Sequence, residues 1–326
     1  MTLQQMKYAL TIAEQGSMNK AAEQLFISQP SLTSAVRELE KEIGIQVFVR
    51  SSRGVSVTAE GADFLMYVRQ VYQQYELLHQ KYGGSGGAKR KFGVSTQHYS
   101  FAVKAFVEMV KNFGTLNFEF AIRETRTMDV LHDVGGFRSE VGIIYQCDYN
   151  RRIIGKMLHE LELEFVPLID CRAYVYLWKD HPLADEKSIG LEQLADYPCL
   201  VFEQGDGASG FLAEEILTDN DYPRIIRSTD RATQLNLMVG LNGYTLCSGI
   251  ICEELNGNEY RAVPFREDEN NRNTVMEIGY VMKKHSILSD IGEVYISEVR
   301  RYLSGCEGYK EENKCAILFN TPRSWS

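Results

Sequence analysis

The sequence lacks the features of a membrane, secreted or zinc-binding protein. It contains no run of 18 apolar residues, so no transmembrane helix is expected. Its N-terminus shows no charged segment followed by an apolar one, which predicts that no signal peptide is present. The seven cysteines form no CxxC pair. Cys247 and Cys252, and Cys306 and Cys315, have spacings that favour ordinary reduced thiols over a zinc site. We therefore expect a cytoplasmic protein that needs no cofactor and contacts no membrane.

Catalytic motifs are also missing. The chain contains no GxSxG, HExxH or GxxxxGK[ST] sequence, and no GxGxxG sequence that opens a helix. It has only six histidines, and none lies near a candidate nucleophile in the sequence. The glycine-rich loop at 205–210 contains an aspartate, which would repel a phosphate. We therefore do not expect an enzyme.

Residues 17–61 have the pattern of two short helices, a tight turn and a small β-wing. Ser17 and Ser28 are suited to cap the two helices, and Pro30 falls in the first turn of the second one. Apolar residues then recur at spacings of four, three and four, at Leu32, Val36, Leu39 and Ile43. This stripe predicts a buried face and leaves the leading face of the second helix free for a partner.

The leading face of the second helix carries small and polar residues. They are Gln29, Pro30, Ser31, Thr33, Ser34 and Arg37. Side chains of this kind at the N-terminal end of such a helix reach base edges in a DNA major groove. The pattern predicts a helix-turn-helix that binds double-stranded DNA. A three-helix packing unit without a DNA role would show the same periodicity.

The segment AAEQLFISQPSLTSAVRELEKEIGIQVF, followed by an arginine and by VTAEG, closely resembles the N-terminal domain of LysR-type transcriptional regulators. The similarity runs without a gap from about Leu3 to Thr58, and the spacing of later segments fits the family to about Leu303. The resemblance implies a sequence-specific transcriptional regulator that is controlled by a small-molecule effector. Some members of the family sense oxidants through paired cysteines, so a redox role for the cysteines stays open.

The predicted wing consists of two short alternating segments joined at Gly54. Arg50 and Arg53 would lie near the phosphate backbone or the minor groove of the same duplex. A solvated loop position for Arg53, and a local carboxylate partner for Arg50, are the alternatives.

The net charge of −9 is divided unevenly along the chain. Residues 1–91 contain 11 Lys and Arg against 8 Asp and Glu, whereas the remainder contains 24 against 36. The acidic excess therefore belongs to the second part of the chain, which need not touch phosphate. The first part is only mildly basic. Because affinity rises with the number of phosphates neutralised, a pair of such domains is expected on DNA.

A long helix is predicted after Thr58. Its apolar positions are spaced four, three, four, three and four apart, at Phe64, Val68, Val71, Tyr75, Leu78 and Tyr82. This heptad seam is typical of helices that pair along their length, and it predicts a homodimer. Packing against the first helix of the same chain, through Met6 and Leu10, is the alternative for part of the seam. Five Gly and Ser residues at 83–87 then predict a flexible hinge.

Strands and helices alternate beyond the hinge, which predicts parallel sheets covered by helices. We expect two α/β lobes, with lobe I at about 91–160 and 268–304 and lobe II at about 161–267. Two such lobes resemble periplasmic solute-binding proteins. The effector domain of LysR-type regulators has this fold. The predicted fold class is therefore α/β behind an N-terminal winged helix-turn-helix. The predicted parts are the winged helix-turn-helix at 1–58, the linker helix at 59–82, the hinge at 83–90, the effector domain at 91–304 and a tail at 305–326.

Ligands of open α/β sheets lie beyond the carboxyl ends of the strands, next to helix N-termini. Small donors occupy these places in the sequence, and the resemblance implies that some of them match effector contacts of the family. The predicted contacts are Ser95, Thr96, Gln97, Thr125, Tyr145 and Ser209. A helix cap without a ligand is the alternative at each position. The uncharged first-strand turn suits a carboxylate or a sulfate, and also a neutral ligand.

These features together predict a homodimer, or a homotetramer of two dimers, that binds an inverted repeat. An effector would change the closure of the lobes and, through the hinge, the spacing of the DNA-binding pairs. RNA polymerase would be a further partner. A solute-binding protein with an incidental helical arm is the competing interpretation. The tail departs from the family pattern, which predicts disorder or an accessory flap.

Overall fold

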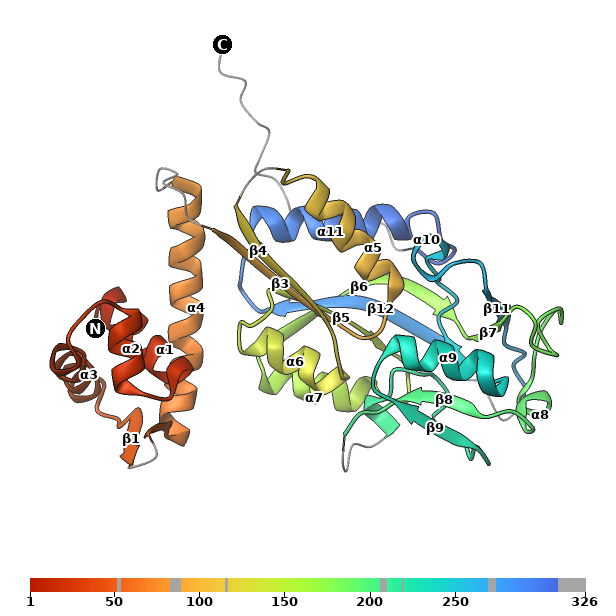
Figure 1. The fold of residues 1–326 in the computed structure, drawn as a ribbon, viewed down its shortest axis with the longest axis horizontal. Helices are drawn as coiled ribbons and strands as arrows, with labels where there is room; N and C mark the ends of the chain where they lie inside the picture. Colours follow the sequence, from red (N-terminus) through yellow and green to blue (C-terminus); the bar gives the residue numbers. More distant parts are fainter. Residues whose placement is uncertain are drawn as a thin grey trace, which may run out of the picture.

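The computed structural model describes residues 1–51, 54–82, 89–114, 117–205, 210–218, 220–268 and 274–309. Figure 1 shows a small helical domain, one long helix and a larger α/β part. Arg53, Ser209, residues 83–88 of the predicted hinge and residues 310–326 of the tail lie outside the described residues. Within the described ranges, no helix combines the length and the apolar character needed to cross a membrane.

The N-terminal domain contains three helices and a two-stranded wing. Its elements are α1 (Leu3–Gln15), α2 (Met18–Gln24), α3 (Gln29–Ile43), β1 (Phe48–Ser51) and β2 (Gly54–Val57). The predicted caps are confirmed, since the side chains of Ser17 and Ser28 accept backbone hydrogen bonds at the N-termini of α2 and α3. Leu32, Val36 and Leu39 are buried in the core that α3 shares with α1 and α2. Helix α3 therefore turns its apolar stripe inward, as predicted.

Helix α4 (Ala59–Tyr82) begins after Thr58, whose hydroxyl accepts a hydrogen bond from the Gly61 N–H at 2.8 Å. Val68 is buried in the core of the N-terminal domain, and Phe64 packs against that core. For these two residues the alternative, packing against the first helix of the same chain, is confirmed. Further along α4, Val71 and Leu78 are exposed. The helix is thus divided, with its first half packed inside the chain and an apolar stripe exposed on its second half.

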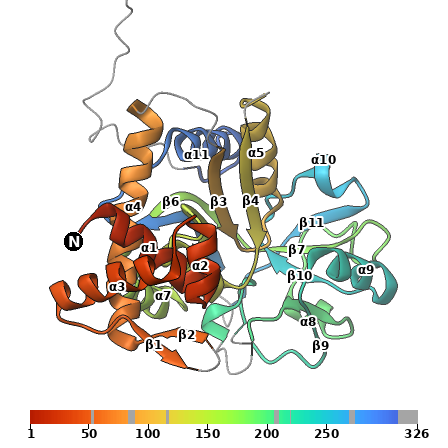
Figure 2. The same cartoon turned by 60° about the vertical axis from the view of Figure 1, so that its left-hand side comes forward.

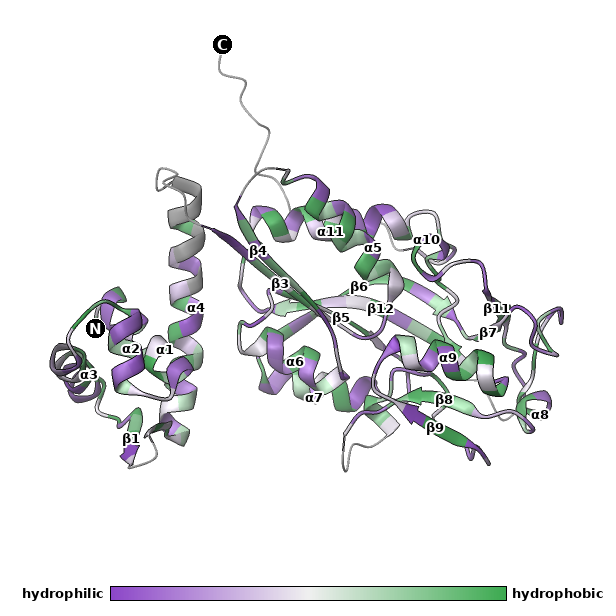
Figure 3. Ribbon diagram, viewed as in Figure 1, coloured by the Kyte–Doolittle hydropathy of each residue, from purple (hydrophilic) through white to green (hydrophobic). Residues whose placement is uncertain are grey.

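Lobe I is built on a mixed five-stranded sheet in the order β4-β3-β5-β12-β6. Its strands are β3 (Arg90–Thr96), β4 (Phe118–Glu124), β5 (Val141–Gln146), β6 (Leu163–Arg172) and β12 (Val275–Lys283). Strand β3 is parallel to β4 and β5, whereas β12 is antiparallel to β5 and β6. Figure 3 shows that hydrophobic residues are concentrated in the central strands of this sheet.

Two helices cover each face of the lobe I sheet (Figures 1 and 2). The helices are α5 (Ser100–Lys111) and α11 (Asp290–Leu303) on one face, and α6 (Thr127–Gly135) and α7 (Arg151–Glu160) on the other. Phe101 and Met109 of α5 pack with Tyr295 of α11 in one hydrophobic core. Leu131 of α6 and Ile154 of α7 lie in a second core. The sheet is thus covered on both faces, as its alternating sequence pattern predicts.

Lobe II contains a three-stranded sheet, β10-β7-β11, and a parallel pair, β8 and β9. Its elements are β7 (Tyr174–Trp178), α8 (Leu191–Leu194), β8 (Cys199–Phe202), a 3-10 turn (Gly210–Leu212), β9 (Ile225–Ser228), α9 (Arg231–Leu241), β10 (Thr245–Cys247), α10 (Glu253–Asn256) and β11 (Tyr260–Pro264). Helix α9 packs on β7, β8 and β9.

The lobes differ from the sequence prediction in two respects. The prediction of a second, all-parallel sheet is wrong, because β7 is antiparallel to both β10 and β11. The boundary between the lobes falls near Ala173 and not near residue 161, because β6 pairs with β12 in the lobe I sheet. The direction in which the chain leaves and re-enters lobe I explains why its sheet is mixed. Strand β6 takes the chain out of lobe I and β12 brings it back, so the two must run in opposite directions.

The first residues of the tail lie along β6. Tyr309 forms an antiparallel bridge with Ile169, and the Asp170 N–H donates a hydrogen bond to the Gly308 carbonyl at 3.1 Å. Gly308 has φ of 86°, and a Cβ there would lie 2.0 Å from the Asp170 carbonyl oxygen. A glycine is therefore required where this part of the tail meets the sheet edge.

Gly61 provides a stability test of the packing between α4 and the wing. A Cβ on Gly61 would lie 2.3 Å from the Val47 carbonyl oxygen and 2.8 Å from Val47 Cα. Because both are backbone atoms, Gly61→Ala is expected to lower the free energy of unfolding by about 1–3 kcal/mol in urea titrations followed by circular dichroism.

The matched control is Gly155→Ala in α7, where no atom lies within 4 Å of the added Cβ. This variant should gain roughly 1 kcal/mol from helix propensity. Equal stabilities of the Gly61→Ala variant and the wild type would contradict the packing seen at α4.

Candidate functional site

Helix α3 presents one face of its N-terminal half to solvent. Pro30, Ser34 and Arg37 are exposed, and Gln29 and Thr33 are half-buried. Their spacings of three and four residues place them on one side of the helix. The Gln29 Nε2 group donates a hydrogen bond to Thr33 Oγ1 at 2.9 Å, which orients the amide. A rigid, polar helix face therefore stands on the buried core of the domain.

The remaining predicted DNA contacts, Ser31, Arg50 and Arg53, differ in their surroundings. Ser31 is exposed, but its hydroxyl lies 2.7 Å from the hydroxyl of Ser28 and so takes part in the cap of α3. Arg50 is exposed on β1. Arg53 lies outside the described residues.

Phe26, in the turn before α3, is a surface feature that sequence interpretation missed. Its side chain is 95% exposed and its backbone has φ of 55°. Exposing an aromatic ring and placing a bulky residue at positive φ are both unfavourable for folding. The turn geometry requires this conformation, and residue type alone does not reveal it.

A cavity of about 80 Å³ lies between the two lobes. Lobe I contributes His98, Tyr99, Ser100 and Met276, and lobe II contributes residues of β8, α9 and β10 and of the segment after the 3-10 turn. One water molecule needs roughly 10–15 Å³ of such cavity volume. The cavity therefore has room for several waters or for a small molecule.

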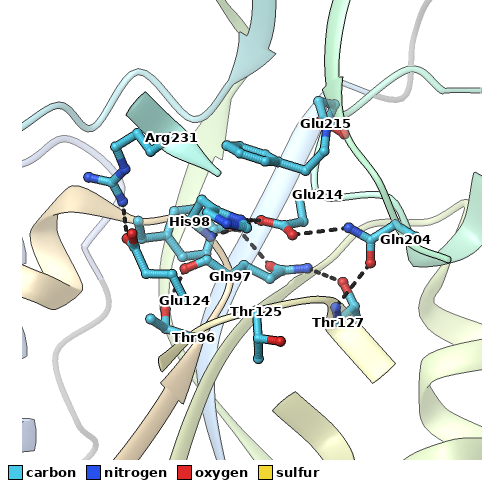
Figure 4. A network of polar contacts seen from close by, with 12 residues as sticks. Thr96, Gln97, His98, Glu124, Thr125, Thr127, Gln204, Glu214, Glu215 and Arg231 are labelled. Carbon is cyan, nitrogen blue, oxygen red and sulfur yellow. Dashed lines mark hydrogen bonds and ion pairs between the residues drawn. The ribbon is translucent and has the colours of Figure 1, made fainter. Parts of the chain in front are cut away.

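Glu214 of lobe II and His98 of lobe I form one wall of this cavity (Figure 4). Glu214 Oε2 accepts hydrogen bonds from the His98 backbone N–H at 2.8 Å and from ring Nδ1 at 2.9 Å. The His98 ring stacks on Phe202 of β8, with 3.7 Å between centroids and 5° between planes. Since both members of the pair are buried, their hydrogen bonds are shielded from water. The lobes are thus joined by a buried polar pair and a ring stack.

Two further side-chain contacts cross between the lobes (Figure 4). Gln204 donates a hydrogen bond to Glu214 Oε1 at 3.0 Å and accepts one from the Thr127 N–H at 3.0 Å. Arg231, at the start of α9, forms an ion pair with Glu124 at the end of β4. Burial raises the pKa of Glu124, and the Arg231 charge opposes that rise. The described lobes therefore meet through an extended polar network.

Glu215, next to the pair, is 4% exposed and lines the same cavity. Its Oε1 atom accepts a hydrogen bond from the Phe202 N–H at 2.7 Å, whereas Oε2 has no partner among the described residues. Burial, with a contribution from the charge of Glu214, raises the pKa of Glu215 to about 8. The carboxyl group is therefore mostly neutral at pH 7.

Ser95, Thr96 and Gln97, which the sequence predicts as effector contacts, lie inside lobe I and not at this cavity. All three are fully buried and do not line the cavity. Ser95 donates a hydrogen bond to Asp133 Oδ2 at 2.6 Å, and Thr96 donates one to the Gln97 carbonyl at 2.8 Å. The Gln97 amide is bonded through both its nitrogen and its oxygen inside lobe I. The cavity begins one residue later, at His98.

Two other predicted effector contacts, Thr125 and Tyr145, do not line the cavity either. The Thr125 hydroxyl donates a hydrogen bond to Asp129 Oδ2 at 3.4 Å, which fits the alternative of a local cap. The Tyr145 hydroxyl donates to the Glu215 carbonyl at 2.8 Å and so ties lobe I to lobe II. Ser209 lies outside the described residues.

Sequence interpretation missed most residues of this site. They are His98, Phe202, Gln204, Glu214, Glu215, Arg231 and Gln234. His98 directly follows the predicted strand end, so extending that turn by one residue would have included it. No local sequence pattern marks the lobe II residues as part of the site, because their contacts with lobe I join distant parts of the chain. Glu214, for example, is 116 positions from His98.

Three of the described cysteines, Cys171, Cys199 and Cys247, do not have the surroundings of reactive thiols. Burial raises the pKa of Cys171 and Cys199 to about 12, and that of Cys247 to about 11. Little thiolate is present at neutral pH under these conditions, and the thiolate is the reactive form. Within the described ranges, no group of three or more His, Cys, Asp or Glu residues is arranged to hold a metal ion.

Two family models match the chain in the regions where the structure shows the two functional parts. The model for bacterial regulatory helix-turn-helix proteins of the lysR family matches residues 3–62, and the LysR substrate binding domain matches residues 117–303. The chain belongs to the LysR family. It is a DNA-binding transcriptional regulator with a C-terminal effector-binding domain, as the sequence predicted.

Relatives and solved structures agree with this assignment. The RuBisCO operon transcriptional regulator of Allochromatium vinosum is 28% identical over 210 residues, which cover 63% of this chain and 65% of that protein, slightly under two thirds. The DNA-binding transcriptional dual regulator OxyR of Escherichia coli (strain K12) is 24% identical over 254 residues, covering 76% and 78%. A full-length OxyR variant from Pseudomonas aeruginosa has the same fold, with a TM-score of 0.66 at 19% identity, covering 96% of this chain and 98% of that one.

Replacing Glu215 tests the raised pKa through stability. The folded state keeps a proton on Glu215 up to about pH 8, whereas the unfolded chain loses it near the ordinary value of 4.5. The free energy of unfolding therefore falls as pH rises between these values. Glu215→Gln removes this loss, so the variant should become more stable than the wild type, by on the order of a few kcal/mol at pH 8.

Urea titrations at pH 5, 6.5 and 8 measure the difference. Glu186→Gln, at an exposed position of lobe II, is the control and should show no such trend. A difference between the Glu215→Gln variant and the wild type that does not grow with pH would contradict a buried neutral carboxyl group.

Proposed function

We propose that this LysR-type regulator binds an inverted-repeat operator as a homodimer and responds to a small molecule bound between its lobes. The observation that carries the DNA part is the polar face of α3, which stands exposed on a buried three-helix core. In helix-turn-helix proteins this helix enters the major groove, and two domains contact half-sites one helical turn apart.

Within the major groove, Gln29 is the proposed base-reading residue. A glutamine amide pairs with adenine through one donor and one acceptor. The contact with Thr33 limits the positions that the Gln29 amide can take. Pro30 and Ser31 would fit against thymine methyls or phosphates. Arg37, one turn beyond Thr33, would contact the DNA backbone and add affinity without sequence preference.

The exposed stripe on the second half of α4 supports the dimer. Val71 and Leu78 lie seven residues apart, or about two helical turns, so they share one side of α4, and Leu78 is 59% exposed. Pairing α4 with its copy would cover these side chains and double the number of phosphates neutralised. A tetramer of two such dimers is a further step of the same proposal.

Effector control would act through the polar network between the lobes. A ligand in the cavity touches both lobes, so it would change the free energy of the closed arrangement relative to an open one. Such a ligand shifts the equilibrium only by its difference in affinity for the two arrangements. The shift would reach the DNA-binding pairs through the hinge at 83–90 and change the DNA bend. RNA polymerase contact, a cytoplasmic location and the absence of catalysis complete the proposal.

Gel-shift titration against the DNA upstream of the coding sequence tests the function directly. We expect binding there at salt concentrations where random duplex of the same length is not bound. The same affinity for both duplexes at every salt concentration would contradict a sequence-specific regulator and favour a solute-binding protein.

Two α3 variants separate base reading from backbone contact. Gln29→Ala should relax discrimination at one base pair of each half-site, with about 1–3 kcal/mol lost on the preferred sequence only. Arg37→Ala should weaken binding to all sequences alike and lower the salt slope by about one per domain. Competition gel shifts with single-base operator variants measure both effects. Uniform losses from both variants would refute this division of roles.

Charges placed in the α4 stripe test the dimer. Val71→Glu combined with Leu78→Glu should convert the dimer to a monomer at micromolar concentration, because each subunit would bury two carboxylates without partners at the interface. Sedimentation velocity measures the change.

Ala62→Glu, at an exposed position on the opposite side of α4, is the control and should leave the dimer intact. A double variant that sediments like the wild type would show that α4 does not form the interface.

A further inference from the structure

Two residues that line the cavity between the lobes each have a buried polar atom without a hydrogen-bond partner among the described residues. Among the described residues, no group pairs with Gln234 Nε2 of α9 or with Glu215 Oε2. Both residues line the cavity and each is 4% exposed. Leaving such groups unpaired costs roughly 1–3 kcal/mol each. Two of them at one cavity indicate that a ligand supplies the missing partners.

The hydrogen-bonding capacity of these groups defines the chemistry of that ligand. The Gln234 amide nitrogen can only donate. Glu215 Oε1 already accepts a hydrogen bond from the Phe202 N–H at 2.7 Å, so a proton on this carboxyl group belongs on Oε2. The neutral acid then donates as well. Both unpartnered groups therefore require an acceptor.

We propose that the effector is a small monocarboxylic acid whose carboxylate accepts hydrogen bonds from the two unpartnered groups, Gln234 Nε2 and Glu215 Oε2. This inference rests on the proposed function of the cavity as the effector site. The ligand group that contacts Glu215 is therefore predicted to be an oxyanion that accepts a hydrogen bond, and an amine is excluded.

The charges around the cavity are consistent with an anionic ligand. Glu214 is hydrogen-bonded to His98, and Glu124 is paired with Arg231, so both neighbouring carboxylates already have partners. Arg231 also lines the cavity on the Gln234 side, since both residues belong to α9, and its charge is matched by that of Glu124. Apolar side chains complete the lining and would contact the body of the acid. They are Phe202, Leu235, Ile250, Ile251 and Met276.

Three titratable groups next to Glu215 do not change their protonation near pH 8, so a pH effect in that range is assigned to Glu215. Burial raises the pKa of Tyr99 and of Tyr145 well above 10, and that of Cys199 to about 12. These three groups stay neutral up to pH 9. Glu214 is the charged neighbour, and it raises the pKa of Glu215 further. The pair of Glu214 with His98 is the other nearby group that a pH experiment must separate from Glu215.

Isothermal titration of the full chain with acids and with amines of matched size tests the proposal. The probes are acetate, butyrate and benzoate against ethylamine, butylamine and benzylamine. We expect at least one acid, and none of the amines, to bind at pH 7. Affinity for the acid should fall about tenfold between pH 7 and pH 9, because binding needs the proton that Glu215 loses near pH 8.

Three variants assign the effect to the two named groups. Gln234→Leu keeps the volume, removes the donor and should weaken acid binding at least tenfold. Glu215→Gln keeps a donor at the same place, so it should bind the acid within threefold of the wild type at pH 7 and lose the pH dependence. Glu186→Gln, exposed in lobe II, is the control and should behave as the wild type.

Several results would overturn the proposal. They are binding of an amine with an affinity that rises with pH, no binding of any acid, and a pH dependence that persists in the Glu215→Gln variant and so belongs to His98. Gel shifts on the same preparations keep the two proposals apart. Operator binding without acid binding refutes only the ligand class, whereas loss of specific DNA binding refutes the proposed function itself.

Discussion

Glu214 holds the effector domain in its closed arrangement, because one carboxylate oxygen accepts hydrogen bonds from both the backbone and the ring of His98. The stacking of His98 on Phe202 and the bond from Gln204 place two more lobe II groups on the same junction. Removing one member would leave a buried polar group unpaired, which costs more than the bond itself contributes. The contacts between the two lobes therefore depend on one another, and in our proposal a ligand in the cavity acts on all of them together.

The neighbouring Glu215 works against this closed arrangement. Its carboxyl group is buried without a partner for Oε2 and keeps its proton up to about pH 8. Closure thus combines a satisfied carboxylate with an unsatisfied acid on adjacent residues. In our proposal a ligand supplies the missing partner of Glu215, and this contact provides the difference in affinity that an effector needs.

Sequence patterns predicted the N-terminal domain well because its determinants are local. The caps at Ser17 and Ser28 and the stripe of α3 depend on residues within one or two helical turns. The seam of α4 was predicted only in part. Periodicity shows that a helix has an apolar face, but not whether Val68 covers its own domain and Leu78 faces a second copy. Ser95 and Gln97 were assigned to a ligand because they end a strand, yet their partners lie inside lobe I.

The sequence by itself determined the family, the exposed polar face of α3 and the division into a mildly basic N-terminal part and an acidic C-terminal part, because spacing, composition and wording along the chain carry that information. Only the tertiary structure decided which side chains form the cavity, how β6 and β12 order the lobe I sheet, and which acid lacks a partner. Those properties arise between residues such as His98 and Glu214, which are 116 positions apart and meet only when both lobes are folded.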